Sequence, residues 1–440
     1  NDPGGGIIYG LEDKPPPLES LTIGLQHVLA MFVGVITPPL LVSANAGFTA
    51  EMTAYLVSVA LIASAVGTIV QIKRRGAVGS GLLCITGTSF AFIPGLTLAG
   101  KEGGLPLIIG MTIAVAPLQM LLAPFLSRLR NFLPPLVSGT FLLLIGLSLI
   151  PASFGYIIRG FGGDAPAYMA HLVALLVFIV LLVSNNFGPS VLRFSSVVIA
   201  FAVGYILCAI LGYLQPLPAS AGLLIVPIPF EFGVSFDWRL FIPFALMYLF
   251  SIMETVADLS ATSEFSGEPT SGDRYWERTR GGVFADGLNS LIAGLLNSFP
   301  NTSFSQNNAV IQLTGVASRY IGYWVAGILL ILGVLPVFGR WVAATPAPVI
   351  GGLTLVLFSL IAVAGIRVMT RGARFDRREV LVVGPALGIG IGLQMRPEIL
   401  APFSDTVQLI FGTPFISGGM TALLLNAILP NRKMEAPDEG

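Results

Sequence analysis

Charged residues are scarce in this sequence: 23 Lys and Arg and 23 Asp and Glu make up only 10% of 440 residues, with a formal net charge of zero. Soluble domains carry about 25% charged residues, so the composition excludes an ordinary soluble protein, and nothing in the charge balance indicates a nucleic-acid partner. Cys84 and Cys208 lie in separate apolar stretches and predict neither a disulfide nor a metal site. With only His27 and His171 beside them, the chain lacks the nucleophile–base or metal constellation of a membrane enzyme.

Hydrophobic residues make up 54% of the chain, and the mean hydropathy is +0.85. Uncharged runs recur that reach the ~20 residues a spanning helix needs. The 51 Gly and 31 Pro are typical of a transporter or channel, because a polar cavity can satisfy the backbone freed at helix interruptions. We expect an all-α polytopic membrane protein with fourteen spans, near residues 20–44, 50–72, 78–100, 105–127, 133–153, 167–187, 194–214, 240–262, 282–299, 303–318, 320–339, 345–366, 379–395 and 407–430.

Basic residues predict the orientation of these spans, because cytoplasmic loops carry an excess of Lys and Arg. With a cytoplasmic N-terminus, 18 of the 23 basic residues lie inside. Leaving out spans 78–100 and 303–318, whose centres are polar and β-leaning, lowers that number to 15, so both segments are expected to cross as broken helices. We expect a cell-membrane protein, inner or plasma, with both termini cytoplasmic. Residues 1–19 then form a flexible tail, and residues 431–440 form a second tail.

Two short matches indicate an internal repeat. Thr88-Ser89-Phe90 recurs as Thr302-Ser303-Phe304, and PPLVSG at 134–139 resembles APVIGG at 347–352, at nearly the same offset of 214 and 213 residues. Seven spans per repeat is an odd number, so the two halves must have opposite orientations. This is the inverted-repeat plan, in which paired broken helices meet near the bilayer midplane and form the site.

The stretch NTSFSQNNAVIQLTG, residues 301–315, concentrates amides in an uncharged segment: Gln306, Asn307, Asn308 and Gln312. A broken helix exposes backbone groups that must face a partner or a polar ligand. These side chains are therefore expected to face a ligand. The alternative is that they join helices by hydrogen bonds, as Asn and Gln do in membranes.

Three acids lie well inside predicted spans, where burial is costly unless function or pairing compensates: Glu254, Asp258 and Asp286. Glu254 and Asp258 are four residues apart and share a helix face, so one of them is expected to hold a proton at neutral pH. The alternative for each is a paired structural acid. His27 is expected to support the site from the first span, and nothing is assigned to His171. The basic runs at 73–75 and 367–378 are explained by topology alone.

QNNAVIQLTG at 306–315 resembles the nucleobase–ascorbate transporter signature, Gln-Asn-x-Gly followed four residues later by Thr and then Gly, Arg or Lys. The resemblance extends over nearly the whole chain and favours the bacterial xanthine and urate branch. Ala309 departs from the signature by replacing its glycine, and its methyl is expected to stiffen the helix start or crowd the backbone, which bears on turnover more than on fold. The other matching stretches are LQHVLAMF, GSGLLCITGTSF, METVAD and GGVFADGLNSLIAGLLNSFPNTSFSQNN.

The resemblance implies a uracil-permease-like fold with a 7+7 inverted repeat, in which spans 3 and 10 carry short β-like stretches. It further implies homodimers in which a core domain moves past a gate domain as an elevator. The core comprises spans 1–4 (20–127) and 8–11 (240–339). The gate comprises spans 5–7 (133–214) and 12–14 (345–430).

The resemblance also implies a site for purine bases, xanthine or urate, with proton coupling and no cofactor. Glu254 and Gln306 would hydrogen-bond the ring, Phe90 and Ser305 would offer backbone N–H groups, and Phe304 would stack on it. The residues that would support this shell are Asp286, Asn307 and His27, with Asp258 as a neighbour.

Ser89 is expected to set selectivity at C8, since a small hydroxyl leaves room for the extra oxygen of urate; the alternative is that it only caps the broken helix. Other open readings are a broader carrier for guanine, hypoxanthine or uracil, Na⁺ coupling, and a channel or anion exchanger on the same fold. The exchanger is disfavoured because the tenth span has no basic residue before Arg319.

Overall fold

The computed structural model describes residues 6–126, 128, 134–162, 165–188, 192–193, 195–219, 222–370 and 376–430. Contacts divide the chain into two compact units. Unit 1 comprises Asn1–Leu126 and Leu149–Leu357, and unit 2 comprises Ser127–Ser148 and Phe358–Gly440. The predicted core and gate domains partition the chain differently and stay a prediction. The predicted tail at 431–440 lies outside the described residues.

The protein is a mostly helical, multi-pass membrane protein. Within the described residues, eight helices are long and apolar enough to span a bilayer, or nine if the bent pair Ile321–Val334 and Pro336–Ala343 counts as one span. Two shorter apolar helices are Ser196–Ile210 and Pro414–Ile428. The predicted total of fourteen therefore stays a prediction. The helices of unit 1 are α1 (Pro17–Ala46), α2 (Ala50–Ile72), α3 (Ile93–Leu122), α6 (Ala167–Phe187), α8 (Ser196–Ile210), α9 (Trp238–Phe265), α10 (Gly272–Leu295), α11 (Gln306–Thr314), α12 (Ile321–Val334) and α13 (Pro336–Ala343). α5 (Pro135–Arg159) and α14 (Ala347–Met369) contribute residues to both units.

Glycine and proline mark the breaks between apolar segments. Gly104 has φ +67° inside α3, at the boundary expected between the third and fourth spans. Only glycine adopts this backbone conformation at little cost, so the helix bends there. α12 and α13 meet at an angle of 74° where Pro336 begins the second helix. The chain thus changes direction in the membrane where a residue prevents regular helix.

Two three-residue strands interrupt the helices of unit 1. β1 (Thr86–Thr88) and β2 (Asn301–Ser303) pair antiparallel, with Thr86 opposite Ser303 and Thr88 opposite Asn301. All six residues are buried. The hydroxyl of Ser64 in α2 donates a hydrogen bond to the carbonyl of Thr86. This strand carbonyl therefore has a partner outside the strand pair. These strands lie in the third and tenth predicted spans, where the sequence is polar and β-leaning.

Unit 2 contains the part of α5 up to Ser148, the end of α14, α15 (Arg377–Met395), the 3₁₀ helix η3 (Pro397–Leu400), α16 (Asp405–Phe411) and α17 (Pro414–Ile428). Glycines allow its helices to approach closely. A β-carbon at Gly146 would lie 2.4 Å from the backbone nitrogen of Ala362, and one at Gly365 would lie 2.4 Å from that of Leu143. Such contacts between small residues are what holds helices together in lipid.

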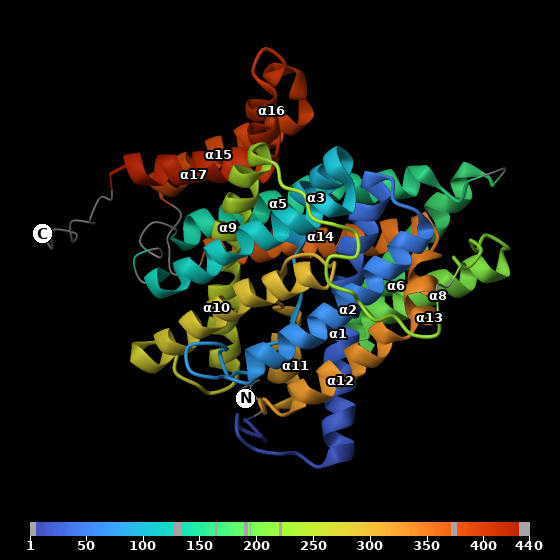
Figure 1. Ribbon diagram of the computed structural model, residues 1–440, viewed down its shortest axis with the longest axis horizontal. Coiled ribbons are helices and arrows are strands. Elements are labelled where there is room, and N and C mark those ends of the chain that lie inside the picture. The colour runs from blue at the N-terminus through green and yellow to red at the C-terminus, as the bar shows by residue number, and fades with distance from the viewer. Residues whose placement is uncertain are drawn as a thin grey trace, which may run out of the picture. The chain divides into compact units, whose positions relative to one another are not determined.

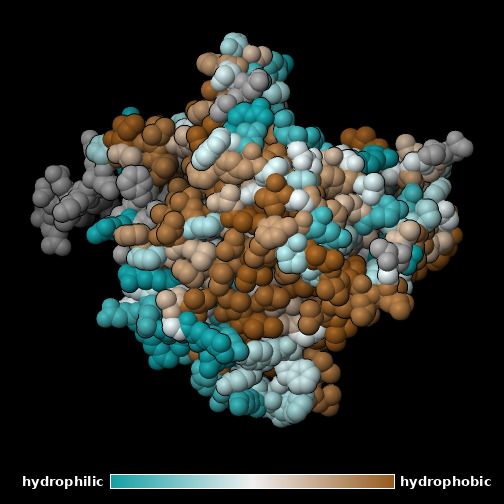
Figure 2. All heavy atoms as spheres, viewed as in Figure 1, coloured by the Kyte–Doolittle hydropathy of each residue, from teal (hydrophilic) through white to brown (hydrophobic). Residues whose placement is uncertain are grey.

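The segment before α1 differs from the flexible tail expected from the sequence. Tyr9 forms a parallel bridge with Val316, just after α11, and the described part of this segment lies beside the link between α11 and α12 (Figure 1). Hydrophilic residues gather at this lower edge, whereas hydrophobic residues dominate the middle of the visible face (Figure 2). Residues 6–16 are therefore part of unit 1.

Candidate functional site

The strand pair places the start of a helix at each of its ends. Ser89 follows β1 and is the N-cap of the 3₁₀ helix η1 (Phe90–Phe92), which leads into α3, and Ser305 is the N-cap of α11. Backbone bonds extend the pairing on both sides, since Ser89 N–H donates to Pro300 O (2.9 Å) and Phe304 N–H donates to Ile85 O (2.9 Å). Backbone N–H groups at helix starts lack intrahelical partners, so this arrangement directs donors and positive dipole ends toward one region.

Asp286 of α10 fastens β2 to the surrounding helices. Its carboxylate accepts hydrogen bonds from the backbone N–H of Ser303 (3.0 Å), the Thr255 hydroxyl (2.7 Å) and the Gln71 amide (2.7 Å), and it is fully buried. The Gln71 amide also donates to Gly282 O (2.9 Å). Sequence reasoning anticipated Asp286 but missed Gln71 and Thr255. The available signal was a lone Gln inside an otherwise apolar helix.

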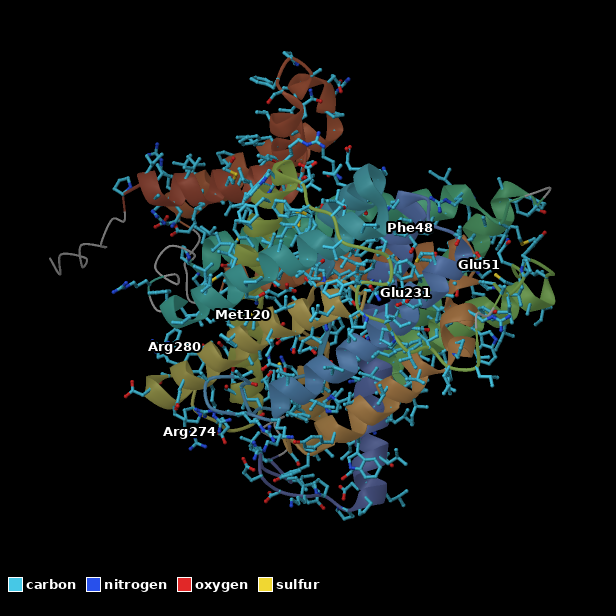
Figure 3. The ribbon with its side chains drawn as sticks, in the orientation of Figure 1. Phe48, Glu51, Met120, Glu231, Arg274 and Arg280 are labelled. Atoms are coloured by element: carbon cyan, nitrogen blue, oxygen red, sulfur yellow. The ribbon has the colours of Figure 1, made fainter. Side chains whose placement is uncertain are left out.

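Figure 3 locates this helix by three labelled side chains. Arg274 and Arg280 project from the first turns of α10. Met120, which belongs to α3, lies beside a later part of α10. A β-carbon at Gly287 would lie 2.8 Å from Cγ of Met120, so α3 packs directly against the turn that carries Asp286. This packing shields the carboxylate from solvent.

Glu254 lies one residue before Thr255, which bonds Asp286, and belongs to α9, the helix that contacts β2, η1 and α11. The side chain is half-buried, and within the described residues its carboxylate has neither a hydrogen bond nor a salt bridge. The alternative of a paired structural acid therefore has no support at Glu254. Asp286, in contrast, is held by several donors. Asp258 is buried one turn farther along α9.

The amides of α11 divide into two groups. Asn307 donates from Nδ2 to the His27 ring nitrogen Nδ1 (3.0 Å) and backbone oxygen (3.1 Å) of α1. Asn308 accepts at Oδ1 from the Thr262 hydroxyl of α9 (2.7 Å). These two residues join helices, as the structural alternative proposed. The side chains of Gln306, which is half-buried, and Gln312, which is exposed, make no hydrogen bond within the described part of the chain.

Phe304 stands between β2 and α11 with its ring buried against two glycines. A β-carbon at Gly34 of α1 would lie 3.0 Å from ring atom Cε2, and one at Gly87 of β1 would lie 2.7 Å from Cζ. Glycine at both positions is what allows the ring to lie this close to the strand. Whether a ligand also covers the ring stays a prediction, and so does a role for Phe90, which is likewise buried.

Several buried polar atoms at the site have no hydrogen-bond partner within the described residues. They include His27 Nε2, Asn307 Oδ1 and Ser89 Oγ. Ser89 is fully buried, and its hydroxyl makes no capping hydrogen bond, so the capping alternative does not describe its side chain. Unpartnered buried polar groups are costly and commonly mark a place that a ligand or water fills.

Two further sequence expectations concern Ala309 and metals. Ala309 is exposed on α11, so its methyl does not crowd the packed side of the helix. Cys84 and Cys208 are buried free thiols. Among the described residues, no group of three His, Cys, Asp or Glu side chains is placed to hold a metal ion.

A family model described as "Permease family" (Xan_ur_permease) matches residues 18–399. The chain belongs to this permease family. Membership places the protein among transporters and not enzymes. Xanthine permease XanP of Escherichia coli (strain K12) is 40% identical over 97% of this chain and 95% of the relative. Xanthine permease XanQ of the same strain is 40% identical over 98% of this chain and 95% of the relative.

A similar fold occurs in the transmembrane domain of the cyanobacterial bicarbonate transporter BicA. The TM-score is 0.56 at 13% identity, with 95% of this chain and 99% of that chain covered. At this identity the likeness concerns the fold alone.

Proposed function

We propose that the protein is a secondary active transporter that imports purine bases, xanthine or urate, by proton symport. The observation that carries the proposal is the Glu254 carboxylate, which has no hydrogen-bond or ion-pair partner among the described residues and lies on α9, the helix that packs against β2, η1 and α11. The names of the relatives XanP and XanQ support xanthine as the substrate class.

The chemistry of the ring fits the residue types around the strand pair. Xanthine presents N–H donors beside carbonyl acceptors, so a carboxylate that accepts and an amide that both donates and accepts can bind one edge in pairs. In the proposal Glu254 and Gln306 take these roles, because neither side chain has a hydrogen-bond partner among the described residues. Backbone N–H groups at Phe90 and Ser305 meet the carbonyl oxygens, and the Phe304 ring covers the flat face.

Proton coupling requires a group whose protonation and substrate binding depend on each other. Glu254 fits this requirement better than Asp286, because Asp286 already accepts from four side-chain or backbone donors that favour a charged carboxylate. We therefore assign coupling to Glu254 and support of the strand pair to Asp286. In the proposal, Asp258 on α9, Asn307 on α11 and His27 on α1 support Glu254 and Asp286 from the surrounding helices.

The antiparallel strand pair also supports an inverted-repeat architecture. β1 and β2 occur in corresponding segments of the two halves, and each is followed directly by a helix start. This is the arrangement of discontinuous helices that forms central sites in transporters. In the proposal a core domain carrying both strands moves past a gate domain as an elevator, in a homodimer.

Uptake into proteoliposomes tests the proposal. We expect labelled xanthine to accumulate when a proton gradient is imposed and to be displaced by urate. Accumulation driven only by a Na⁺ gradient would overturn the coupling ion, and displacement by uracil or guanine equal to that by urate would make the carrier a broader one. Failure to take up any nucleobase would overturn the function. An anion exchanger is disfavoured because α11 has no basic residue.

A further inference from the structure

The segment before α1 forms a strap across the end of α11. We define the N-terminal strap as residues 7–13. Ile8 N–H donates to Gly315 O (2.8 Å), Ala317 N–H donates to Tyr9 O (2.9 Å), and Arg319 N–H donates to Leu11 O (3.1 Å). This alternation is that of a short parallel pairing with the link between α11 and α12.

Apolar side chains anchor the strap to three other parts of unit 1. Leu11 is only 6% exposed and packs in one cluster with Leu82, Cys84 and Leu259. Ile7 lies against Gly267, where an added β-carbon would be 2.5 Å from its Cδ1 atom. Burial of a leucine side chain removes its apolar surface from water, which stabilises the docked strap. The strap is therefore held by burial as well as by backbone bonds.

Polar contacts close both sides of the strap. Glu12 and Arg319 form an ion pair (2.7 Å). The Tyr9 phenol donates to the Glu19 carboxylate at the start of α1 (3.1 Å), and this hydrogen bond raises the pKa of Tyr9. The phenol thus remains a donor at neutral pH.

The segments that the strap joins are those that carry the candidate site. Leu82 and Cys84 precede β1, and Leu259 follows Asp258 on α9. Gly315 caps the end of α11, which begins with Gln306. Glu19 lies in the first turn of α1, which contains His27. We propose that the strap is a positioning element that holds these segments at their common end and stays docked throughout transport. Its partners lie in or near predicted core spans 1, 3, 8, 10 and 11, so motion of that core would not separate them.

The transport part of this inference rests on the proposed function, whereas docking itself is tested without any purine. Ile8→Pro removes the shorter of the two N–H bonds to Gly315 O, the other being donated by Tyr9 at 3.3 Å. The matched control Ile8→Thr keeps both donors and replaces the same exposed side chain. We expect amide hydrogen exchange in residues 306–319 to become about tenfold faster in Ile8→Pro and to stay unchanged in Ile8→Thr. Equal exchange in wild type and Ile8→Pro would overturn the inference.

Measurements of xanthine binding and uptake by Leu11 variants distinguish a positioning role of the strap from a role in folding alone. Leu11→Ser should weaken xanthine binding about tenfold, whereas the conservative Leu11→Met should restore it. Both proteins should remain monodisperse in detergent, and the xanthine concentration for half-maximal uptake should rise while maximal uptake is kept. Unchanged binding in Leu11→Ser, or a loss confined to maximal uptake, would count against a positioning role.

The double variant Tyr9→Cys, Val316→Cys tests whether the strap remains docked, because a disulfide between the two new cysteines would prevent it from leaving. Bridge partners lie within the Cα spacing that disulfides require, and the native thiols are buried. We expect the bond to form and uptake to be the same before and after reduction. A bond that fails to form would contradict docking, and uptake regained only on reduction would show that the strap must leave. If wild type transports no purine, the proposed function fails, and the exchange and disulfide-formation results still decide docking.

Discussion

At the residue scale, Glu254 and Asp286 carry the same carboxylate group but differ in the hydrogen bonds that it accepts. Glu254→Gln keeps the side-chain shape but removes the titrating carboxylate. We expect it to abolish proton-driven accumulation of xanthine while the protein still reaches the membrane, because an amide cannot bind and release the coupled proton. Uptake with and without an imposed proton gradient measures this. Glu102→Gln, at an exposed acid distant in sequence, is the control; accumulation by Glu254→Gln at the wild-type level would remove Glu254 from the mechanism.

Ser89, next to Phe90, has a fully buried hydroxyl that finds no hydrogen-bond partner in the described part of the chain. Asn is larger, so Ser89→Asn should keep xanthine binding and weaken urate by about 1–3 kcal/mol, the scale of one misplaced buried polar group. Rejection of one added oxygen requires a clash or an unpaired group, since attraction alone discriminates weakly. Competition of labelled xanthine uptake by urate measures the effect, with Ser89→Ala as the variant that adds no volume. Equal inhibition of wild type and Ser89→Asn by urate would show that Ser89 does not set the C8 end of the pocket.

At the scale of elements, the strand pair depends on α10 through Asp286. Asp286→Ala leaves the buried N–H of Ser303 and the amide of Gln71 without this acceptor, at about 1–3 kcal/mol for each unsatisfied group. We expect a lower melting temperature and loss of xanthine binding together, because β2 positions Phe304 and α11. Thr255→Val removes only one of the donors and should cost about 1 kcal/mol. Thermal unfolding in detergent with and without xanthine measures both; an Asp286→Ala protein as stable as Thr255→Val would contradict the anchoring role.

At the scale of the whole molecule, the distribution of basic residues predicts that both termini are cytoplasmic, with 18 of 23 Lys and Arg inside. A reporter active only in the cytoplasm should therefore be active when fused to either end of the chain. An even number of spans is required for this result, so activity at one end alone would contradict the fourteen-span topology. A fusion in the loop after residue 214 serves as the opposite-side control, because the seventh expected span, 194–214, ends there.

Much of the architecture is predictable because hydropathy and helix breaking are local properties. The apolar runs indicated the helices of a multi-pass membrane protein, and the polar centres near Thr86 and Asn301 indicated the interruptions where strands form. The side of α11 that each amide faces was less predictable. Asn307 and Asn308 lie next to each other but bond to α1 and α9 respectively, because adjacent helical residues point about 100° apart and the neighbours come from distant segments.

The sequence by itself determined that this chain belongs in a bilayer, where its helices are interrupted, and which acids and amides are out of place in an apolar segment. Each of these follows from composition within one segment. Only the tertiary structure decided that Gln71 meets Asp286, 215 residues away, and that the N-terminal strap pairs with the end of α11. It also decided that the Glu254 carboxylate has no partner among the residues that the structure describes. Hydrogen bonds and burial depend on which surfaces meet, and spacing along the chain does not specify that when the partners lie hundreds of residues apart.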